Sequence, residues 1–308
     1  MARILVTGGS GFVGWGVPAL LLERGHEVHL VCRSPDQADW PPRTRAACII
    51  HAADLRADDT PARIIRAVRP THLVHFAWYA EPGRFRASPL NLDWTAASLR
   101  LYRAFAESGG ERFVGCGTCA EYDWRFHTLS EATTPLVPAT LYGTAKASLF
   151  RMLEAASGQG GPGFAWGRVF FPFGPRERPG RLLPDVITAL LAGREVAVSE
   201  GRQICDFLAV EDAARAFAAL VCADISGAVN IASGIGTSVR ALVEATAARI
   251  GRPELVRFGA RPTGPDEVPY IVADVRRLRD ELHCLAPLRL GDALDETIAW
   301  WRERTQCR

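Results

Sequence analysis

A glycine-rich turn near the N-terminus is the feature that most constrains the fold. The segment Thr-Gly-Gly-Ser-Gly-Phe-Val-Gly occupies positions 7–14, after an apolar run and before a helical pattern that begins near Val17. Its glycines allow a tight turn that brings backbone N–H groups against a pyrophosphate, with the positive end of the helix dipole facing the same oxygens. The order strand, turn, helix therefore predicts a dinucleotide-binding site, with these candidate contacts: Gly8, Gly11, Phe12, Val13 and Gly14.

The same segment does not predict a hydrolase. A nucleophile elbow needs the pattern G-x-S-x-G, and Phe12 stands where the second glycine after Ser10 is required.

Apolar, strand-like runs alternate with amphipathic helical patterns over the first 171 residues. Strands are predicted at 27–32, 48–50, 72–77, 112–116 and 164–171, and helices at 62–68, 90–105 and 142–155. Such alternation predicts a parallel sheet covered on both faces, since right-handed crossovers place the helices there. The predicted fold class is therefore α/β, and residues 1–171 are expected to form a doubly wound (Rossmann) dinucleotide-binding domain.

The composition changes after residue 171. Prolines and glycines interrupt regular structure between 172 and 184, and helical patterns follow at 183–192, 211–221, 239–250, 275–282 and 290–304. We expect residues 172–308 to form a smaller, mostly helical substrate-binding lobe, with a segment near 203–231 returning to the main sheet.

Charge and cysteine content narrow the choice of partners. The formal net charge is +2 and basic residues are interspersed with acidic ones, so we expect no nucleic acid and no anionic membrane surface as partner. No apolar run approaches the ~20 residues of a membrane span, which favours a cytoplasmic protein. The eight cysteines include a C-x-x-C at 116–119 but no second pair, so free thiols and no metal site are expected. Small molecules are the expected partners.

Tyr142 and Lys146 stand four residues apart in a predicted helix and therefore share one face. A nearby ammonium favours the phenolate, which lowers the pKa of Tyr142 and makes it a usable general acid/base for a hydroxyl or carbonyl. Thr118 follows the fifth predicted strand, at the sheet edge where doubly wound folds bind ligands. These three residues are the predicted catalytic group.

In this order, the motifs resemble the extended short-chain dehydrogenases/reductases, which include NAD(P)-dependent nucleotide-sugar epimerases, dehydratases and reductases. The resemblance covers nearly the whole chain and rests on the glycine turn, Asp54-Leu55, residues 75–77, Asn91, Thr118, Tyr142 with Lys146, residues 171–175, Asp206-Phe207 with Asp212, and residues 230–234. It implies a homodimer formed through helices 92–105 and 142–155.

The resemblance also implies further cofactor contacts. Asp54 and Leu55 would contact adenine, and Lys146 would also hold the nicotinamide ribose. The rest of the implied cofactor site consists of Phe76, Ala77, Pro172 and Phe173.

The chain departs from the family pattern in the residues that select the cofactor and the substrate. Where an NAD enzyme carries an acid after the second strand, this chain has Cys32 followed by Arg33 and Ser34, which can bind a 2′-phosphate. NADP(H) is therefore the predicted cofactor, with NAD(H) as the alternative. Cys205 replaces a frequent arginine, so the substrate diphosphate is expected to rely on Arg202 or Arg261, while Tyr79 begins a loop that shapes the substrate site.

A third departure concerns the reaction. Two positions after Thr118, where dehydratases have glutamate and several epimerases cysteine, this chain has Ala120. The adjacent Cys119 is expected to point away from the reacting carbon, since neighbours on an extended segment face opposite sides.

The leading hypothesis is NADP(H)-dependent reduction of a keto group on a nucleotide-diphosphate (6-deoxy)sugar, with hydride from the nicotinamide and a proton through Tyr142. A nucleotide-sugar 4-epimerase with retained NAD needs no residue beyond the same three. A non-catalytic NADP-sensing protein is a third possibility on this fold, and the intact pair of Tyr142 and Lys146 favours an enzyme over it.

Overall fold

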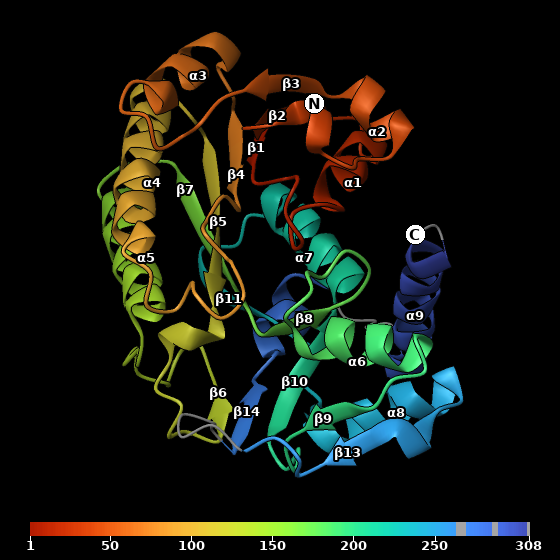
Figure 1. The fold of residues 1–308 in the computed structure, drawn as a ribbon. Helices are drawn as coiled ribbons and strands as arrows, with labels where there is room; N and C mark the ends of the chain where they lie inside the picture. The colour runs from red at the N-terminus through yellow and green to blue at the C-terminus, as the bar shows by residue number, and fades with distance from the viewer. Residues whose placement is uncertain (263–268, 285–288, 307–308) are drawn as a thin grey trace.

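The computed structural model describes residues 1–262, 269–284 and 289–306 (Figure 1). Its main element is a seven-stranded parallel sheet in the order β3-β2-β1-β4-β5-β7-β11. The strands are β1 (Arg3–Thr7), β2 (Glu27–Cys32), β3 (Ile49–Ala52), β4 (His72–His75), β5 (Arg112–Thr118), β7 (Gly163–Val169) and β11 (Gly227–Ile231). The strand order reverses between β1 and β4, which opens a crevice at their carboxyl ends. The predicted doubly wound α/β class is confirmed.

Helices cover both faces of this sheet. α1 (Val17–Glu23) and α7 (Val210–Cys222) pack on one face, in a core that includes Ile4, Val6 and Phe217. α3 (Thr60–Val68), α4 (Leu90–Glu107) and α5 (Leu141–Gly158) pack on the other face, in a core that includes Leu5 and Phe105. Successive residues of β1 thus enter opposite cores, which explains why its sequence is apolar without alternation.

The connection between β2 and β3 supports the glycine turn. It contains the short helices η1 (Pro35–Gln37) and α2 (Pro42–Ala47), with Trp40 between them. Trp40 is buried, and its Nε1 donates a hydrogen bond to the carbonyl oxygen of Gly9 at 2.8 Å. This hydrogen bond holds the backbone of the glycine turn in place at Gly9.

The C-terminal part contains α6 (Leu182–Leu191), α8 (Val239–Ile250), α9 (Leu290–Gln306) and the short turns η3 (Pro253–Leu255) and η4 (Arg277–Glu281). It also contains strands that the sequence patterns do not predict. β10 (Ile204–Ala209) pairs with β8 (Phe171–Phe173), β12 (Gly236–Ser238) and β14 (Tyr270–Ala273), and β14 pairs with β6 (Thr128–Leu129). β9 (Val196–Val198) pairs with β13 (Val256–Phe258).

These pairings add detail to the sequence-based expectations. The lobe is mostly helical, as expected, and it also contains strands, most of them of two to four residues, that show no readable alternation in the sequence. Within the segment 203–231, β10 belongs to the second sheet, and only α7 and β11 pack with the main one. Among the described residues, none of the helices combines the length and the apolar composition needed to cross a membrane.

Candidate active site

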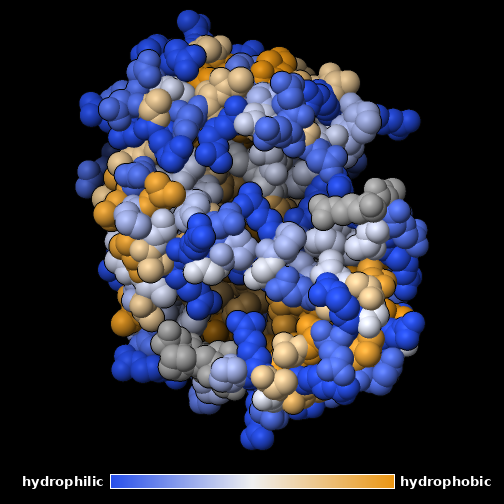
Figure 2. Space-filling model, in the orientation of Figure 1, coloured by the Kyte–Doolittle hydropathy of each residue, from blue (hydrophilic) through white to orange (hydrophobic). Residues whose placement is uncertain are grey.

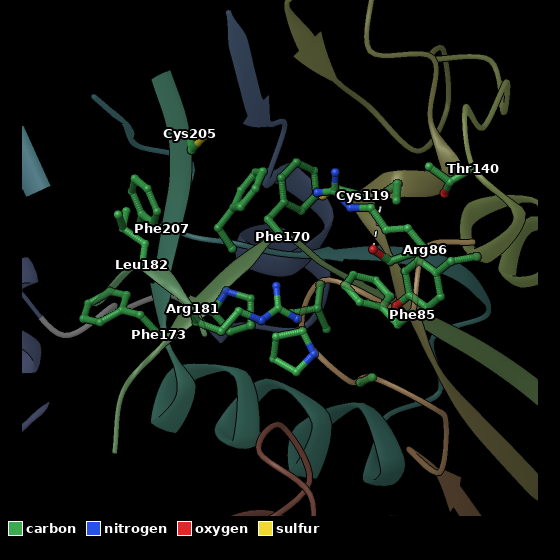
Figure 3. A pocket seen from close by; sticks show the side chains of 18 of the residues that line it. Phe85, Arg86, Cys119, Thr140, Phe170, Phe173, Arg181, Leu182, Cys205 and Phe207 are labelled. Atoms are coloured by element: carbon green, nitrogen blue, oxygen red, sulfur yellow. Dashed lines mark hydrogen bonds between the residues drawn. The ribbon is translucent and has the colours of Figure 1, made fainter. Parts of the chain in front are cut away.

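A cavity of about 1900 Å³ lies at the carboxyl edge of the main sheet and extends to the second sheet and α6. Figure 2 shows the molecule hollowed in this region, with hydrophobic side chains visible inside. In Figure 3, Phe173, Leu182 and Phe207 lie on one side of the cavity and Phe85 and Arg86 on the other. Typical small-ligand pockets measure about 300–1000 Å³, so this cavity has room for two ligands.

The glycine turn forms one end of the cavity. Gly8 has a φ of +71°, and a Cβ there would lie 2.5 Å from the backbone nitrogen of Ala77, at the end of β4. A Cβ on Gly14 would lie 2.7 Å from the carbonyl oxygen of Gly8. All five predicted contacts of this turn (Gly8, Gly11, Phe12, Val13 and Gly14) line the cavity. The turn thus excludes side chains on its packed side and is open toward the cavity, as a dinucleotide pyrophosphate requires.

Thr118, Tyr142 and Lys146 come together through the contact of α5 with the end of β5. The Thr140 hydroxyl caps α5 by accepting a hydrogen bond from the Gly143 nitrogen at 3.1 Å. Gly143 itself packs so closely on the carbonyl oxygen of Ala120 that a methyl group there would overlap it. The hydroxyl groups of Thr118 and Tyr142 are hydrogen-bonded, and the three predicted catalytic residues all line the cavity.

Lys146 is buried, with 3% of its surface exposed. Its ammonium donates a hydrogen bond to the carbonyl oxygen of Cys116 at 2.8 Å and lies 3.8 Å from the ring centroid of Trp78. Burial lowers the pKa of Lys146 to about 8, so the side chain is still mainly a cation at neutral pH.

The expected lowering of the Tyr142 pKa is not found in this structure. Burial raises the pKa of Tyr142 above its ordinary value, while the hydrogen bond with Thr118 acts in the opposite direction. The physical reason is that the Lys146 ammonium is directed at Cys116 and Trp78 rather than at the phenol. Tyr142 is therefore a proton donor at neutral pH in this state.

A buried ion pair supports the end of β5. Glu121 is 0% exposed and Arg168 2%, and the Arg168 Nε donates to Glu121 Oε2 at 2.7 Å. The other carboxylate oxygen accepts hydrogen bonds from the Thr118 nitrogen at 2.8 Å and from Trp166 Nε1 at 2.9 Å. The carboxylate fixes the backbone of Thr118 and has no free oxygen to offer a substrate.

The neighbouring titratable groups are poor acid/base catalysts. Residues 119–121 form the 3₁₀ turn η2 (Cys119–Glu121) rather than an extended segment, and Cys119 is among the residues around the cavity but is 4% exposed and packs in a core with Tyr122 and Leu129. Burial raises the pKa of Cys119 and keeps it a neutral thiol. Arg125 holds the pKa of Asp123 below its usual range through hydrogen bonds of 2.6–3.1 Å, so Asp123 stays a carboxylate.

The predicted adenosine contacts lie beyond the lining of the cavity, after β2 and β3. Arg33 and Ser34 are exposed at the end of β2, whereas Leu55 is buried. Asp54 forms an ion pair with Arg56 at 2.7 Å, and the charge of Arg33 also lowers the pKa of Asp54. Of the other implied cofactor residues, Ala77 lies against the glycine turn, and the cavity is lined by Phe76, Pro172 and Phe173.

Only one of the three predicted substrate-binding residues lines the cavity. Arg261 lines the cavity, whereas Arg202 is exposed away from it and Tyr79 packs with the core on the α4 side. The structure adds residues that sequence reasoning missed, namely Trp78, Phe85, Arg86, Arg178, Arg181 and Tyr270. Trp78 could have been found, since it directly follows the motif at 75–77. Phe85, Arg86, Arg178 and Arg181 come from loops with no readable pattern, and Tyr270 begins the short strand β14.

Among the described residues, no cluster of three or more histidine, cysteine or acidic side chains is placed to hold a metal ion. The motif residues Asp206 and Asn230 are structural: Asp206 accepts hydrogen bonds from the nitrogens of Ser233 and Gly234, and Asn230 accepts one from the Tyr122 hydroxyl at 2.7 Å.

A doubly wound sheet, a glycine turn and a Thr–Tyr–Lys group at its carboxyl edge define an enzyme of the short-chain dehydrogenase/reductase type. More specifically, the family model described as "NAD dependent epimerase/dehydratase family" matches residues 4–232, and the chain belongs to this family.

Curated relatives and solved structures agree with this assignment. The chain is 29% identical to a dTDP-glucose 4,6-dehydratase of Streptomyces griseus, over 98% of this chain and 94% of the relative. It is 25% identical to UDP-glucose 4-epimerase 3 of Oryza sativa subsp. japonica, over 97% of this chain and 89% of the relative. The structure of MoeE5 in complex with UDP-glucuronic acid and NAD superposes with a TM-score of 0.83 at 27% identity, over 98% of this chain and 99% of the MoeE5 chain.

Proposed function

We propose that this protein reduces a keto group on a nucleotide-diphosphate (6-deoxy)sugar with NADP(H). The observation that supports this most strongly is the state of the groups beside Thr118. Ala120 offers no titratable group, Glu121 is sequestered by Arg168, and Tyr142 remains the proton donor. Dehydration needs additional acid/base groups at neighbouring carbons, whereas reduction of a carbonyl needs one proton donor and a hydride.

In the proposed reaction, Tyr142 gives its proton to the keto oxygen and Thr118 donates a hydrogen bond that positions the same oxygen. A reduced nicotinamide bound along the glycine turn would supply the hydride. Lys146 would hold the nicotinamide ribose and stabilise the phenolate left after proton transfer. The glycine turn would bind the pyrophosphate, and Pro172 and Phe173 of β8 would exclude water from the nicotinamide side.

The preference for NADP(H) is supported by charge at the ends of β2 and β3. Arg33 is exposed, and the nearby pair of Asp54 and Arg56 is already neutralised internally. The local charge is therefore positive, which suits a 2′-phosphate. For the substrate diphosphate, Arg261 is the better placed of the two predicted arginines, because Arg202 does not line the cavity.

A nucleotide-sugar 4-epimerase with retained NAD is the second candidate. Several relatives are named UDP-glucose 4-epimerases, and the same three catalytic residues would suffice. The two reactions differ in cofactor stoichiometry, since a reductase consumes one NADPH per product and an epimerase consumes none.

The test is to incubate the purified protein with nucleotide 4-keto-6-deoxyhexoses in the presence of NADPH or NADH, and separately with nucleotide hexoses in the presence of NAD⁺ or NADP⁺ as well as of NADPH. We expect NADPH oxidation only with the keto sugars. Interconversion of hexoses without NADPH consumption would assign the protein to the epimerases, and formation of a 4-keto-6-deoxy product would make it a dehydratase.

We further propose that the chain works as a homodimer in the cytoplasm, with residues 1–171 and 172–308 as its two lobes. α4 and α5 lie side by side (Figure 1) and carry the exposed apolar side chains Leu92 and Met152. Light scattering of the wild type and of a Leu92→Glu variant tests the dimer, which the variant should weaken.

A further inference from the structure

Lys146 is the only lysine in the chain. The other 35 of the 36 lysine and arginine residues are arginines. A guanidinium is always charged in proteins, whereas an ammonium changes its pKa readily when buried. The one ammonium side chain of the chain therefore stands on the helical face that it shares with Tyr142.

The side chain of Trp78 is fixed beneath this cation. Its Nε1 donates a hydrogen bond to Asn91 Oδ1 at 2.9 Å, and the Asn91 amide in turn donates to the carbonyl oxygens of Phe85 at 2.7 Å and Ser88 at 2.9 Å. The ring also stacks on Trp94, with 6.4 Å between the centroids. These contacts hold the ring with its face toward the Lys146 ammonium, which lies 3.8 Å from the ring centroid.

Little else near Lys146 favours the charged form. His75 of β4 is kept neutral, because burial lowers its pKa to about 3. The Glu121 carboxylate of η2 favours the cation but is already paired with Arg168, and Cys116 of β5 and Tyr142 of α5 are uncharged at neutral pH. Burial opposes the charge, and apart from the Cys116 carbonyl the closest compensating group is the negative face of the Trp78 indole at 3.8 Å; the ring of Trp166 is farther away, at 5.8 Å.

We propose that Trp78 is a positioning residue that keeps Lys146 protonated and in place through a cation–π interaction. The ring has two opposite effects: it excludes water, which disfavours the ammonium, and its π face attracts the ammonium. The proposal is that the attraction predominates. The role of this charge in turnover rests on the proposed function, but the charge state of Lys146 does not.

The test uses the single lysine. Protein labelled with ¹³C and ¹⁵N in lysine gives one side-chain signal, which reports the pKa of Lys146 directly in the absence of substrate and cofactor. A fully ring-fluorinated tryptophan incorporated at position 78 keeps the shape of the side chain and removes the negative charge from its face. We expect the pKa of Lys146 to fall by about half to one unit, the range of a partly desolvated cation–π contact.

The same analogue at position 94 is the matched control. Trp94 belongs to the same ring stack but faces Arg56, at 6.0 Å, rather than Lys146. Its fluorination should leave the lysine signal unchanged. A Lys146 pKa that stays constant or rises with the analogue at position 78 would overturn the proposal, because the indole would then act only by excluding water.

Kinetics separate this proposal from the proposed function. With a keto-sugar substrate and NADPH, the basic limb of the kcat/KM profile should move to lower pH by the same amount as the NMR pKa. If the NMR pKa of Lys146 shifts but the basic limb of the kcat/KM profile does not, the cation–π assignment is supported. The same result would show that the charge of Lys146 does not control the rate-determining step.

Discussion

Replacement of Arg168 by methionine should destabilise the protein more than any loss of a surface charge. The variant keeps the volume of the side chain but leaves Glu121 as an unpaired carboxylate with 0% exposure. Removing one partner of a buried ion pair costs about 3–5 kcal/mol. At ~2.1 cal/mol/K per residue, a chain of this length has an unfolding entropy of about 0.65 kcal/mol/K, so the melting temperature should fall by roughly 5–8 °C.

Thermal and urea denaturation of Arg168→Met and Arg103→Met make the comparison. Arg103 pairs with Glu107 at 2.8 Å, but both side chains are exposed and such a pair contributes only about 0–1 kcal/mol. Turnover should also fall in Arg168→Met, because Glu121 orients the backbone of Thr118. If the two variants lose similar stability, the buried pair is not what supports the end of β5, and the reasoning fails.

Four further substitutions test the site. Tyr142→Phe should lower turnover by roughly 10²- to 10⁴-fold and leave NADPH binding unchanged, so substantial residual activity with intact binding would identify another acid. Arg33→Ala should weaken NADPH by about 1.5–3 kcal/mol and leave NADH unaffected in a fluorescence titration; equal losses for both cofactors would contradict a 2′-phosphate contact. Gly143→Ala should abolish activity with the fold retained by circular dichroism, because the methyl group displaces α5 from Ala120; unimpaired kinetics would refute this. Lys146→Met should be more stable than wild type by about 3 kcal/mol below pH 8, since the folded pKa of about 8 lies below the ordinary value of ~10.4. That advantage should shrink as the pH rises from 8 to about 10.4, and urea denaturation across this range checks it.

The main sheet could be predicted from the sequence because its signals are local. Residues 4–6 lie in both cores, so the strand is a continuous apolar run, and the glycine pattern fixes the turn that follows. The pair of Tyr142 and Lys146 could be found because one helical turn brings them to one face, and Thr118 because a strand end places it at the sheet edge.

The rest depended on contacts between distant segments. The pairing of Glu121 with Arg168 joins η2 to β7, and nothing in either local pattern indicates it. Burial raises the pKa of Tyr142, and the Lys146 ammonium, which is directed at the Cys116 carbonyl, does not counteract it; spacing in the sequence determines neither. The second sheet was missed because all of its strands except β10 have only two to four residues and give no periodic signal.

The relatives also show why overall similarity does not decide the reaction. A dehydratase and an epimerase match this chain at 29% and 25% identity over nearly its whole length, so the reaction must be determined by a few side chains beside a common catalytic group. In this chain, the position that carries the acid/base residue of dehydratases is Ala120, and the adjacent carboxylate is held by three hydrogen bonds inside the protein. The remaining candidates in this segment for receiving a proton from a carbon next to the keto group are Cys119 and Asp123. Burial keeps the first a neutral thiol and Arg125 keeps the second ionised, so neither can both accept and return a proton near neutral pH. These side chains therefore support the proposed reduction, in which Tyr142 supplies the proton, over a dehydration.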